Sequence, residues 1–197
     1  MITTTNLSSR NWLGPYRVFA IFALMVLTLL SLSRIGLLLW QWPRVEGSGD
    51  LGWMLLQGVR ADLILVGLLL AVPVLLAPVL ALPKLFKFWR GFALIWSLIA
   101  LTLVIFIELS TPSFVAQYDI RPNRLYIEYL KYPKEVFSTL WQGFRGPLIG
   151  GTLLTFLLVW AGVRVLGAQA KQMRPFSVLR LCLTWPLVVI VVFISIR

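Results

Sequence analysis

Residues 58–82 decide the fold, because they read GVRADLILVGLLLAVPVLLAPVLAL and carry charges, Arg60 and Asp62, only near their first end. A hydrocarbon core of about 30 Å is crossed by about 20 apolar helical residues, so this run is long enough to span a membrane. Four more runs qualify, and the predicted spans are 16–39, 58–82, 92–109, 148–166 and 178–196. The sequence therefore predicts an all-α, polytopic membrane protein whose residues 1–197 form a single membrane domain.

Two features of these spans have simple structural explanations. Residues 16–39 are followed by Trp-Gln-Trp-Pro rather than by small cleavage-site residues, so we interpret the run as a retained anchor and not as a signal peptide. Three prolines lie within spans: Pro73, Pro78 and Pro186. Each leaves one backbone carbonyl of its helix without the usual N–H donor, and we expect that carbonyl to bond to another group.

Composition supports the membrane class and argues against several others. The chain is 59% hydrophobic and only 13% charged, whereas about 25% of a soluble domain is charged. Its net charge of +11 comes from residues between apolar runs, which favours membrane orientation over nucleic-acid binding. There is no histidine, and the one cysteine, Cys182, lies in an apolar run, so no zinc-type ligand cluster is expected. No phosphate loop, nucleophile elbow or dinucleotide fingerprint is present, and we expect neither catalysis nor a cofactor in this chain alone.

The charges between spans predict the orientation. Every second segment outside the spans, starting from the N-terminal tail, carries basic residues and no acid. These residues are Arg10 and Arg17; Lys84, Lys87 and Arg90; Arg164, Lys171, Arg174 and Arg180. Cytoplasmic loops are enriched in Lys and Arg, so we expect a cytoplasmic N-terminus and an extracytoplasmic C-terminus.

Residues 113–146 are too polar to span a membrane and too apolar for a passive linker. Val136, Phe137, Leu140 and Trp141 fall on one helical stripe, with Glu135 and other polar residues opposite. The pattern predicts two short amphipathic helices in the outer interface between the third and fourth spans. Packing of these helices on the bundle without any contact to a substrate is an alternative, and the two possibilities are compatible.

Four ionisable residues lie inside or at the edge of spans: Arg34, Arg60, Asp62 and Glu108. A rise of 1.5 Å per residue puts Arg34 and Glu108 about 27 Å along their helices from the cytoplasmic side. All four are thus expected near the outer headgroup layer, where ionisable groups are costly unless paired or hydrated. Arginines there could hold a lipid phosphate through forked hydrogen bonds. The alternative is local ion pairing, for example between Arg60 and Glu108.

Residues 118–130 (YDIRPNRLYIEYL) and 132–136 (YPKEV) resemble the extracytoplasmic segment of the lipoteichoic-acid-synthase-like phosphoglycerol transferases, proteobacterial type. Residues 58–62 (GVRAD) and the order of the five spans are also similar to that family. The resemblance implies a bacterial inner-membrane location. In the family, the fifth span leads to a sulfatase-like catalytic domain with a threonine nucleophile and manganese, which transfers glycerol phosphate from phosphatidylglycerol.

That catalytic domain is not in this sequence, so the resemblance implies an anchoring and lipid-presenting role, with enzymatic activity expected only in a parent protein. We expect the chain to be the membrane part of a longer or split gene product. The candidate residues for contact with the lipid headgroup or the catalytic domain are Arg60, Asp62, Arg121, Asn123, Arg124 and Glu128, with Arg121 and Arg124 engaging phosphate. Two alternatives remain: the membrane domain of a phosphoethanolamine transferase, and a stand-alone, non-enzymatic scaffold or regulator.

Overall fold

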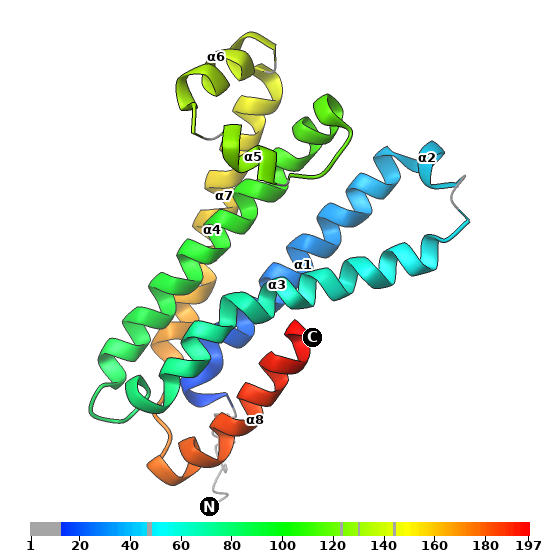
Figure 1. Cartoon of the computed structure of the whole chain (residues 1–197). Helices are drawn as coiled ribbons and strands as arrows, with labels where there is room; N and C mark the ends of the chain where they lie inside the picture. The colour runs from blue at the N-terminus through cyan, green and yellow to red at the C-terminus, as the bar shows by residue number, and fades with distance from the viewer. Residues whose placement is uncertain (1–12, 47–48, 123, 130, 144) are drawn as a thin grey trace, which may run out of the picture.

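The computed structural model describes residues 13–46, 49–122, 124–129, 131–143 and 145–197, and it is helical throughout its regular parts. The elements are η1 (Gly14–Tyr16), α1 (Arg17–Trp40), α2 (Trp42–Glu46), α3 (Leu51–Leu80), α4 (Phe86–Tyr118), α5 (Arg124–Tyr129), α6 (Pro133–Gly143), α7 (Arg145–Gln172) and α8 (Val178–Ile196) (Figure 1). Five helices, α1 together with η1, α3, α4, α7 and α8, are long and apolar enough to cross a membrane. The predicted all-α, polytopic membrane fold is confirmed.

The third span is longer than predicted. Helix α4 continues through Pro112 to Tyr118 and so takes up the first residues of the segment predicted to be interfacial. The hydroxyls of Ser110 and Thr111 donate to the carbonyls four residues earlier, at 2.7 and 2.9 Å, so these polar residues stay helical. The helix ends at Asp119, which adopts the left-handed conformation (φ 59°) common at helix C-termini.

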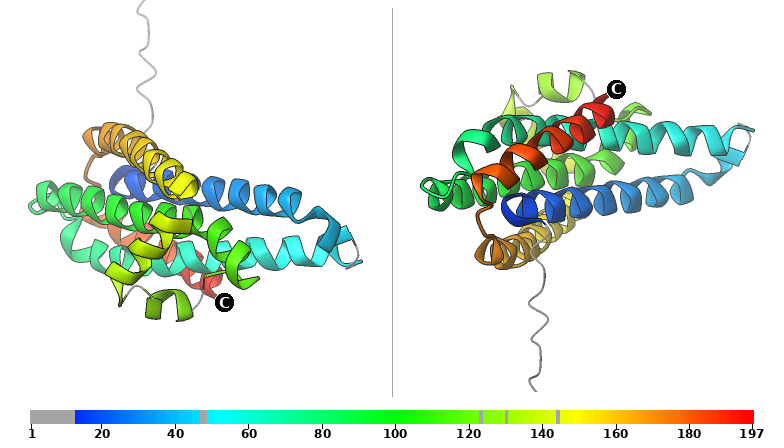
Figure 2. Two further views of the ribbon diagram at one scale, coloured as in Figure 1. Left: turned by 90° about the horizontal axis from the view of Figure 1, so that it is seen from above. Right: turned by 90° about the horizontal axis from the view of Figure 1, so that it is seen from below.

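Helix α1 lies in the middle of the bundle and contacts α3, α4 and α7, while α3 packs on α8 and α4 packs on α7. In both views of Figure 2, α7 and α8 lie on opposite sides of α1. The turns 81–85 and 173–177 and η1 lie together at one end, and α2, α5 and α6 lie at the other (Figure 1). We call these the basic end and the distal end of the bundle.

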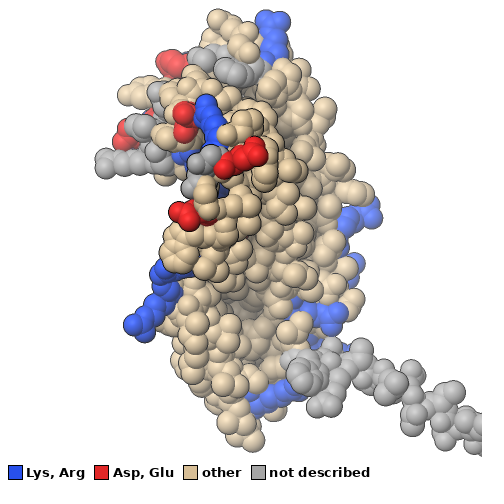
Figure 3. Space-filling model, turned by 90° about the vertical axis from the view of Figure 1, so that its right-hand side faces the viewer, with Lys and Arg blue, Asp and Glu red and all other residues tan. Residues whose placement is uncertain are grey.

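Charge separates the two ends. The basic end carries only basic residues among its described charged side chains: Arg17, Lys84, Lys87, Arg90, Lys171, Arg174 and Arg180. The acidic side chains of the chain all belong to α2, α5, α6, the loops beside them and the distal parts of α3 and α4. Figure 3 shows the same division on one face, with acidic side chains in the upper part and basic ones alone in the lower part.

The core is densest near the basic end. Val18, Phe22 and Val26 repeat at helical spacing on the inner face of α1 and are fully buried. Trp89 at the start of α4 is also fully buried, and its indole N–H donates to the carbonyl of Pro15 at 2.9 Å. This bond fixes η1 against α4 and satisfies a buried donor that would otherwise be costly.

The prolines of α3 are accommodated by tryptophans from neighbouring helices. Pro73 has no N–H for the carbonyl of Leu69, and Trp96 of α4 donates to that carbonyl at 2.9 Å. Pro78 likewise leaves the carbonyl of Val74 without its helical partner, and Trp185 of α8 donates to it at 2.8 Å. The predicted replacement partners therefore exist at both positions, and each one joins α3 to another helix.

Candidate functional site

A buried ion pair lies between α1 and α3, toward the distal end. The Arg34 guanidinium donates to Asp62 at 2.6 Å and to the carbonyl of Gly58 at 2.6 Å, and the two charged side chains are only 12% and 9% exposed. A Cβ on Gly58 would lie 2.4 Å from the Arg34 guanidinium carbon, so a larger residue here would require the guanidinium to move. Gly58 and Asp62 of the 58–62 motif are thus explained by packing around Arg34.

The ion pair suggested between Arg60 and Glu108 is wrong. Glu108 instead accepts a hydrogen bond from Ser33 of α1, and Arg60 donates to the carbonyl of Arg197 at 2.9 Å. The pair that does form at this level is Arg34–Asp62, because Arg34 faces α3 while Ser33, the next residue along α1, faces α4. Sequence spacing gave the depth of these groups but could not give the direction in which each one points.

Arg60 borders a groove between α3 and α8. The groove has a volume of about 380 Å³ and apolar walls formed by Leu56, Val59, Leu63, Val191 and Ile194, with Ser195 and Arg197 at its end. Arg60 is exposed and lies about 30 Å along α3 from Leu80 at its basic end, close to the thickness of a hydrocarbon core. Among the residues that the structure describes, two arginines and no acid line this space, which we call the Arg60 groove.

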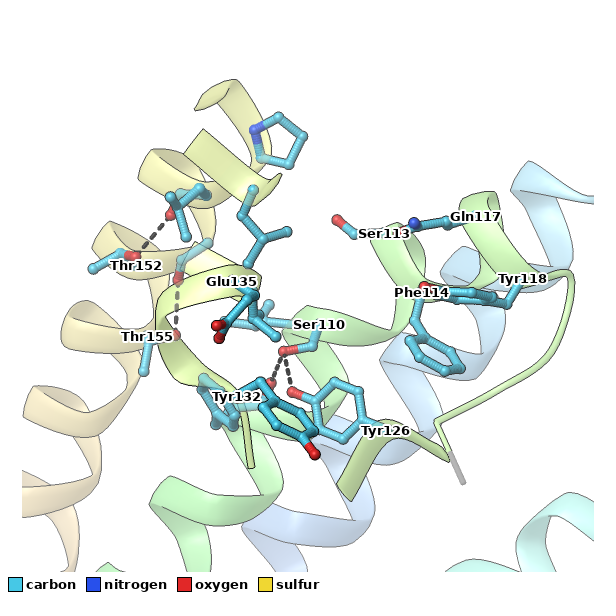
Figure 4. A pocket seen from close by; sticks show the side chains of 17 residues that line it. Ser110, Ser113, Phe114, Gln117, Tyr118, Tyr126, Tyr132, Glu135, Thr152 and Thr155 are labelled. Carbon is cyan, nitrogen blue, oxygen red and sulfur yellow. Dashed lines mark hydrogen bonds between the residues drawn. The ribbon is translucent and has the colours of Figure 1, made fainter. Parts of the chain in front are cut away.

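A second and larger space, of about 450 Å³, lies at the distal end among α4, α5, α6 and α7. We call it the distal pocket. Its apolar walls include Phe106, Phe114, Val136, Leu140 and Leu148. Its polar lining comes from Ser110, Ser113, Gln117, Tyr118, Tyr126, Tyr132, Glu135, Thr152 and Thr155 (Figure 4).

The distal pocket is closed on one side by Tyr126 of α5. Its ring packs edge-on against Phe114 with centroids 5.5 Å apart, and its hydroxyl donates to Ser110 at 2.9 Å. Burial raises the pKa of the Tyr126 phenol above its ordinary value. The phenol is therefore neutral at ordinary pH and holds α5 against α4.

Helix α6 is amphipathic as predicted, and its apolar stripe divides between two environments. Val136 and Leu140 are partly buried and line the distal pocket. Phe137 and Trp141 are exposed and stack on each other with centroids 5.9 Å apart. Packing on the bundle and an outward aromatic face therefore occur in the same helix.

The remaining predicted residues lie in or beside α5. Arg121 is exposed in the turn between α4 and α5 and is not among the lining residues of either space. Glu128 is partly exposed in α5. Asn123 and the side chain of Arg124 lie outside what the structure describes, so their predicted contacts are not addressed by it.

Sequence analysis missed most of the polar lining of the distal pocket. Thr152 and Thr155 are three residues apart in an apolar span, so they share one helix face, and Ser110 was placed just beyond the predicted end of the third span. The threonine spacing was a usable signal for a polar face. Glu135 belongs to the predicted polar face of its helix, and nothing in the sequence indicated that its side chain lines a pocket beside α7.

Comparison with known proteins does not identify the chain. No protein-family model matches it, and no solved structure matches it. Among the residues whose placement is described, no group of three or more His, Cys, Asp or Glu could hold a metal ion.

Proposed function

We propose that this chain is the membrane-anchoring and lipid-presenting part of a phosphoglycerol-transferase-like enzyme. It holds phosphatidylglycerol at the outer face of the bacterial inner membrane and offers the headgroup to a catalytic domain. The chain itself positions the lipid, and the phosphoryl transfer belongs to that domain. The resemblance of residues 118–136 and 58–62 to this enzyme family supports the assignment.

The observation that carries the proposal is the Arg60 groove. An anionic phospholipid needs cations beside its phosphate and apolar walls along its acyl chains, and the groove combines exposed Arg60 with five aliphatic side chains. A guanidinium matches phosphate oxygens through paired N–H donors, and it costs less to desolvate than an ammonium. The bound phosphate would replace the carbonyl of Arg197 as the acceptor of the Arg60 hydrogen bond.

The position of the groove also suits presentation to an attached domain. Arg60 lies against Arg197, so a domain that follows α8 would start beside the bound headgroup. The charge difference between the ends of the bundle supports the orientation, because a purely basic end belongs in the cytoplasm. The distal end, with α5 and α6, then faces the periplasm.

Binding of phosphatidylglycerol to the purified chain tests the proposal. Native mass spectrometry of the wild-type protein and of Arg60→Gln, each titrated with phosphatidylglycerol, should show at least a tenfold weaker affinity for the variant. Arg145→Gln is the matched control, because Arg145 is exposed at the distal end, packs over Trp141 and lines neither space.

Equal phosphatidylglycerol binding by the wild-type protein and Arg60→Gln would show that the Arg60 groove is not the binding site. Equal losses in Arg60→Gln and Arg145→Gln would point to a general surface-charge effect. Preference of the Arg60 site for phosphatidylethanolamine would favour the phosphoethanolamine transferase alternative. If neither lipid binds, the alternative of a stand-alone, non-enzymatic scaffold or regulator would be favoured.

A further inference from the structure

Arg164 of α7 lies farther from the end of its helix than the other basic residues near the basic end. The predicted fourth span ends two residues after Arg164, but α7 continues as a helix to Gln172, about 12 Å farther along. The other basic residues of this end lie in turns or within about 6 Å of a helix end: Arg17, Lys84, Lys87, Arg90, Lys171, Arg174 and Arg180. Helix α7 has 28 residues and is about 42 Å long, so when it is centred on a hydrocarbon core of about 30 Å, Arg164 lies about 6 Å inside that core.

The chain offers Arg164 no carboxylate side chain as a partner at this depth. Residues 136–197 contain no Asp or Glu, and the acidic side chains before them belong to the distal parts of the molecule. The guanidinium packs over the ring of Trp160, 4.8 Å from the ring centroid. It makes no hydrogen bond or ion pair with another residue that the structure describes. Because an arginine inside a span is costly unless it is paired or hydrated, Arg164 needs a counter-ion from outside the chain.

Arg164 belongs to the face of α7 that turns away from the bundle. At 3.6 residues per turn, Trp160, Arg164 and Lys171 fall within about 40° of one another around the helix axis, and all three are exposed. The buried residues of α7 lie on the opposite face: Gly162, Leu166 and Ala170. The outward face therefore combines two cations with an aromatic ring in contact with one of them.

Gly167 leaves a space between these two cations. It lies on the same face, three residues after Arg164 and four before Lys171, and a Cβ at this position would meet nothing within 4 Å. Helical side chains lean toward the N-terminus of their helix, so Lys171 is expected to extend over Gly167 toward Arg164. A group seated over Gly167 would thus be within reach of both cations.

The surroundings of this space favour a lipid phosphate as the anion. A guanidinium stacked on a ring keeps its N–H groups in its own plane, where they can donate in pairs to phosphate oxygens. Toward the membrane centre the same face continues with Trp160, Leu157 and Leu153, which are 56%, 58% and 65% exposed and offer an apolar surface to an acyl chain. A free phosphate would have to leave water to reach Arg164, whereas a lipid phosphate already lies at the boundary of the hydrocarbon core.

We propose that the outward face of α7 binds an anionic phospholipid from the leaflet at the basic end of the bundle. Its phosphate lies over Gly167 between Arg164 and Lys171, and an acyl chain lies along Trp160 and Leu157. Two cations without a neighbouring acid favour a lipid with a net negative charge over a zwitterionic one. This site is separate from the Arg60 groove, which lies between α3 and α8 in the other leaflet, and it does not depend on the proposed presentation of phosphatidylglycerol.

Native mass spectrometry of the full chain, titrated with phosphatidylglycerol, phosphatidylcholine or inorganic phosphate, tests this proposal. Arg164→Gln should weaken the binding of one phosphatidylglycerol by about tenfold or more, the factor expected for a lost charge-assisted hydrogen bond. Lys171→Gln removes one charge beside the headgroup and should weaken it by about fivefold. Gly167→Leu keeps both cations, meets no other group within the bundle and fills the space over residue 167, so it should weaken binding as much as Arg164→Gln.

Arg180→Gln is the matched control. Arg180 also packs over an aromatic ring, that of Phe176 at 4.1 Å, but it lies in the first turn of α8. Helices α7 and α8 lie on opposite sides of α1 (Figure 2), so this variant should bind phosphatidylglycerol like the wild-type protein. The loss in Arg164→Gln should be the same when Arg60→Gln is also present, which separates a failure here from a failure of the Arg60 groove.

Each other outcome overturns a defined part of the proposal. An unchanged affinity in Arg164→Gln would refute the site, and an equal loss in Arg180→Gln would show a general effect of charge at the basic end. Unchanged binding by Gly167→Leu would show that the headgroup does not lie over residue 167. Equal binding of phosphatidylcholine would show that net charge is not recognised, and inorganic phosphate that binds as tightly as the lipid would show that the acyl chains make no contribution.

Discussion

The two tryptophan–proline arrangements on α3 give the sharpest energetic prediction. Trp96→Phe removes the indole N–H that reaches the Leu69 carbonyl at 2.9 Å, and Pro73 cannot supply a replacement. In the Pro73→Ala background, the alanine N–H can bond to Leu69 as in an ordinary helix. Trp96→Phe should therefore cost less in that background than in the wild-type protein.

The difference between these two costs is the coupling free energy of positions 73 and 96, and its size follows from the hydrogen bond that the Leu69 carbonyl loses. A buried polar group left unsatisfied costs about 1–3 kcal/mol in soluble proteins. Interhelical hydrogen bonds in a membrane protein average only about 0.6 kcal/mol, with a maximum of about 1.7. We expect a coupling free energy of about 0.6–1.7 kcal/mol between positions 73 and 96, obtained from a double-mutant cycle.

Reversible unfolding in mixed micelles, or steric trapping in bicelles, measures the free energy of unfolding of the four proteins in the cycle. The second pair, Trp185 with Pro78, acts on the Val74 carbonyl and should show a similar coupling. The crossed pairs, Trp96 with Pro78 and Trp185 with Pro73, share no carbonyl and serve as controls. Coupling that is absent in the matched pairs, or as large in the crossed ones, would refute the reasoning.

Further predictions concern the Arg34 site and α5. Gly58→Ala should lower the free energy of unfolding by about 1–3 kcal/mol, because its Cβ would lie 2.4 Å from the Arg34 guanidinium carbon and the guanidinium would have to move away from the carbonyl of residue 58; Gly36→Ala, which meets nothing within 4 Å, should be nearly neutral in the same assay. The difference-absorbance titration of the wild-type protein against Tyr126→Phe should place the Tyr126 pKa above 10.0. Because the folded-state pKa exceeds the unfolded value, the stability from Tyr126 is complete below about pH 10 and is lost as the pH rises through the folded-state pKa; a Tyr126 pKa at or below 10 would contradict the described burial.

The fold could be predicted because a membrane span depends on a local property. Long apolar runs identify themselves by length and composition, so all five spanning helices were found. The end of α4 was misplaced because Ser110 and Thr111 lower the hydropathy of the run. In the helix, their hydroxyls bond to the backbone, so they do not end it.

The candidate sites were harder to predict because they depend on how helices face one another. Arg34, Asp62 and Glu108 were identified as costly groups that need partners, and all three have partners in the structure. Which residue pairs with which depends on helix rotation, and a single sequence contains no measure of it. The distal pocket was missed for the same reason, since Thr152, Thr155 and Glu135 meet only when α6 folds back onto α7.

The most direct test of lipid presentation is a structure of the chain in phosphatidylglycerol nanodiscs by electron cryomicroscopy. The account predicts one lipid in the Arg60 groove, with its phosphate within hydrogen-bonding distance of Arg60 and an acyl chain between α3 and α8. An empty groove, or phosphatidylglycerol bound only at Arg121 or beside Glu135, would contradict it.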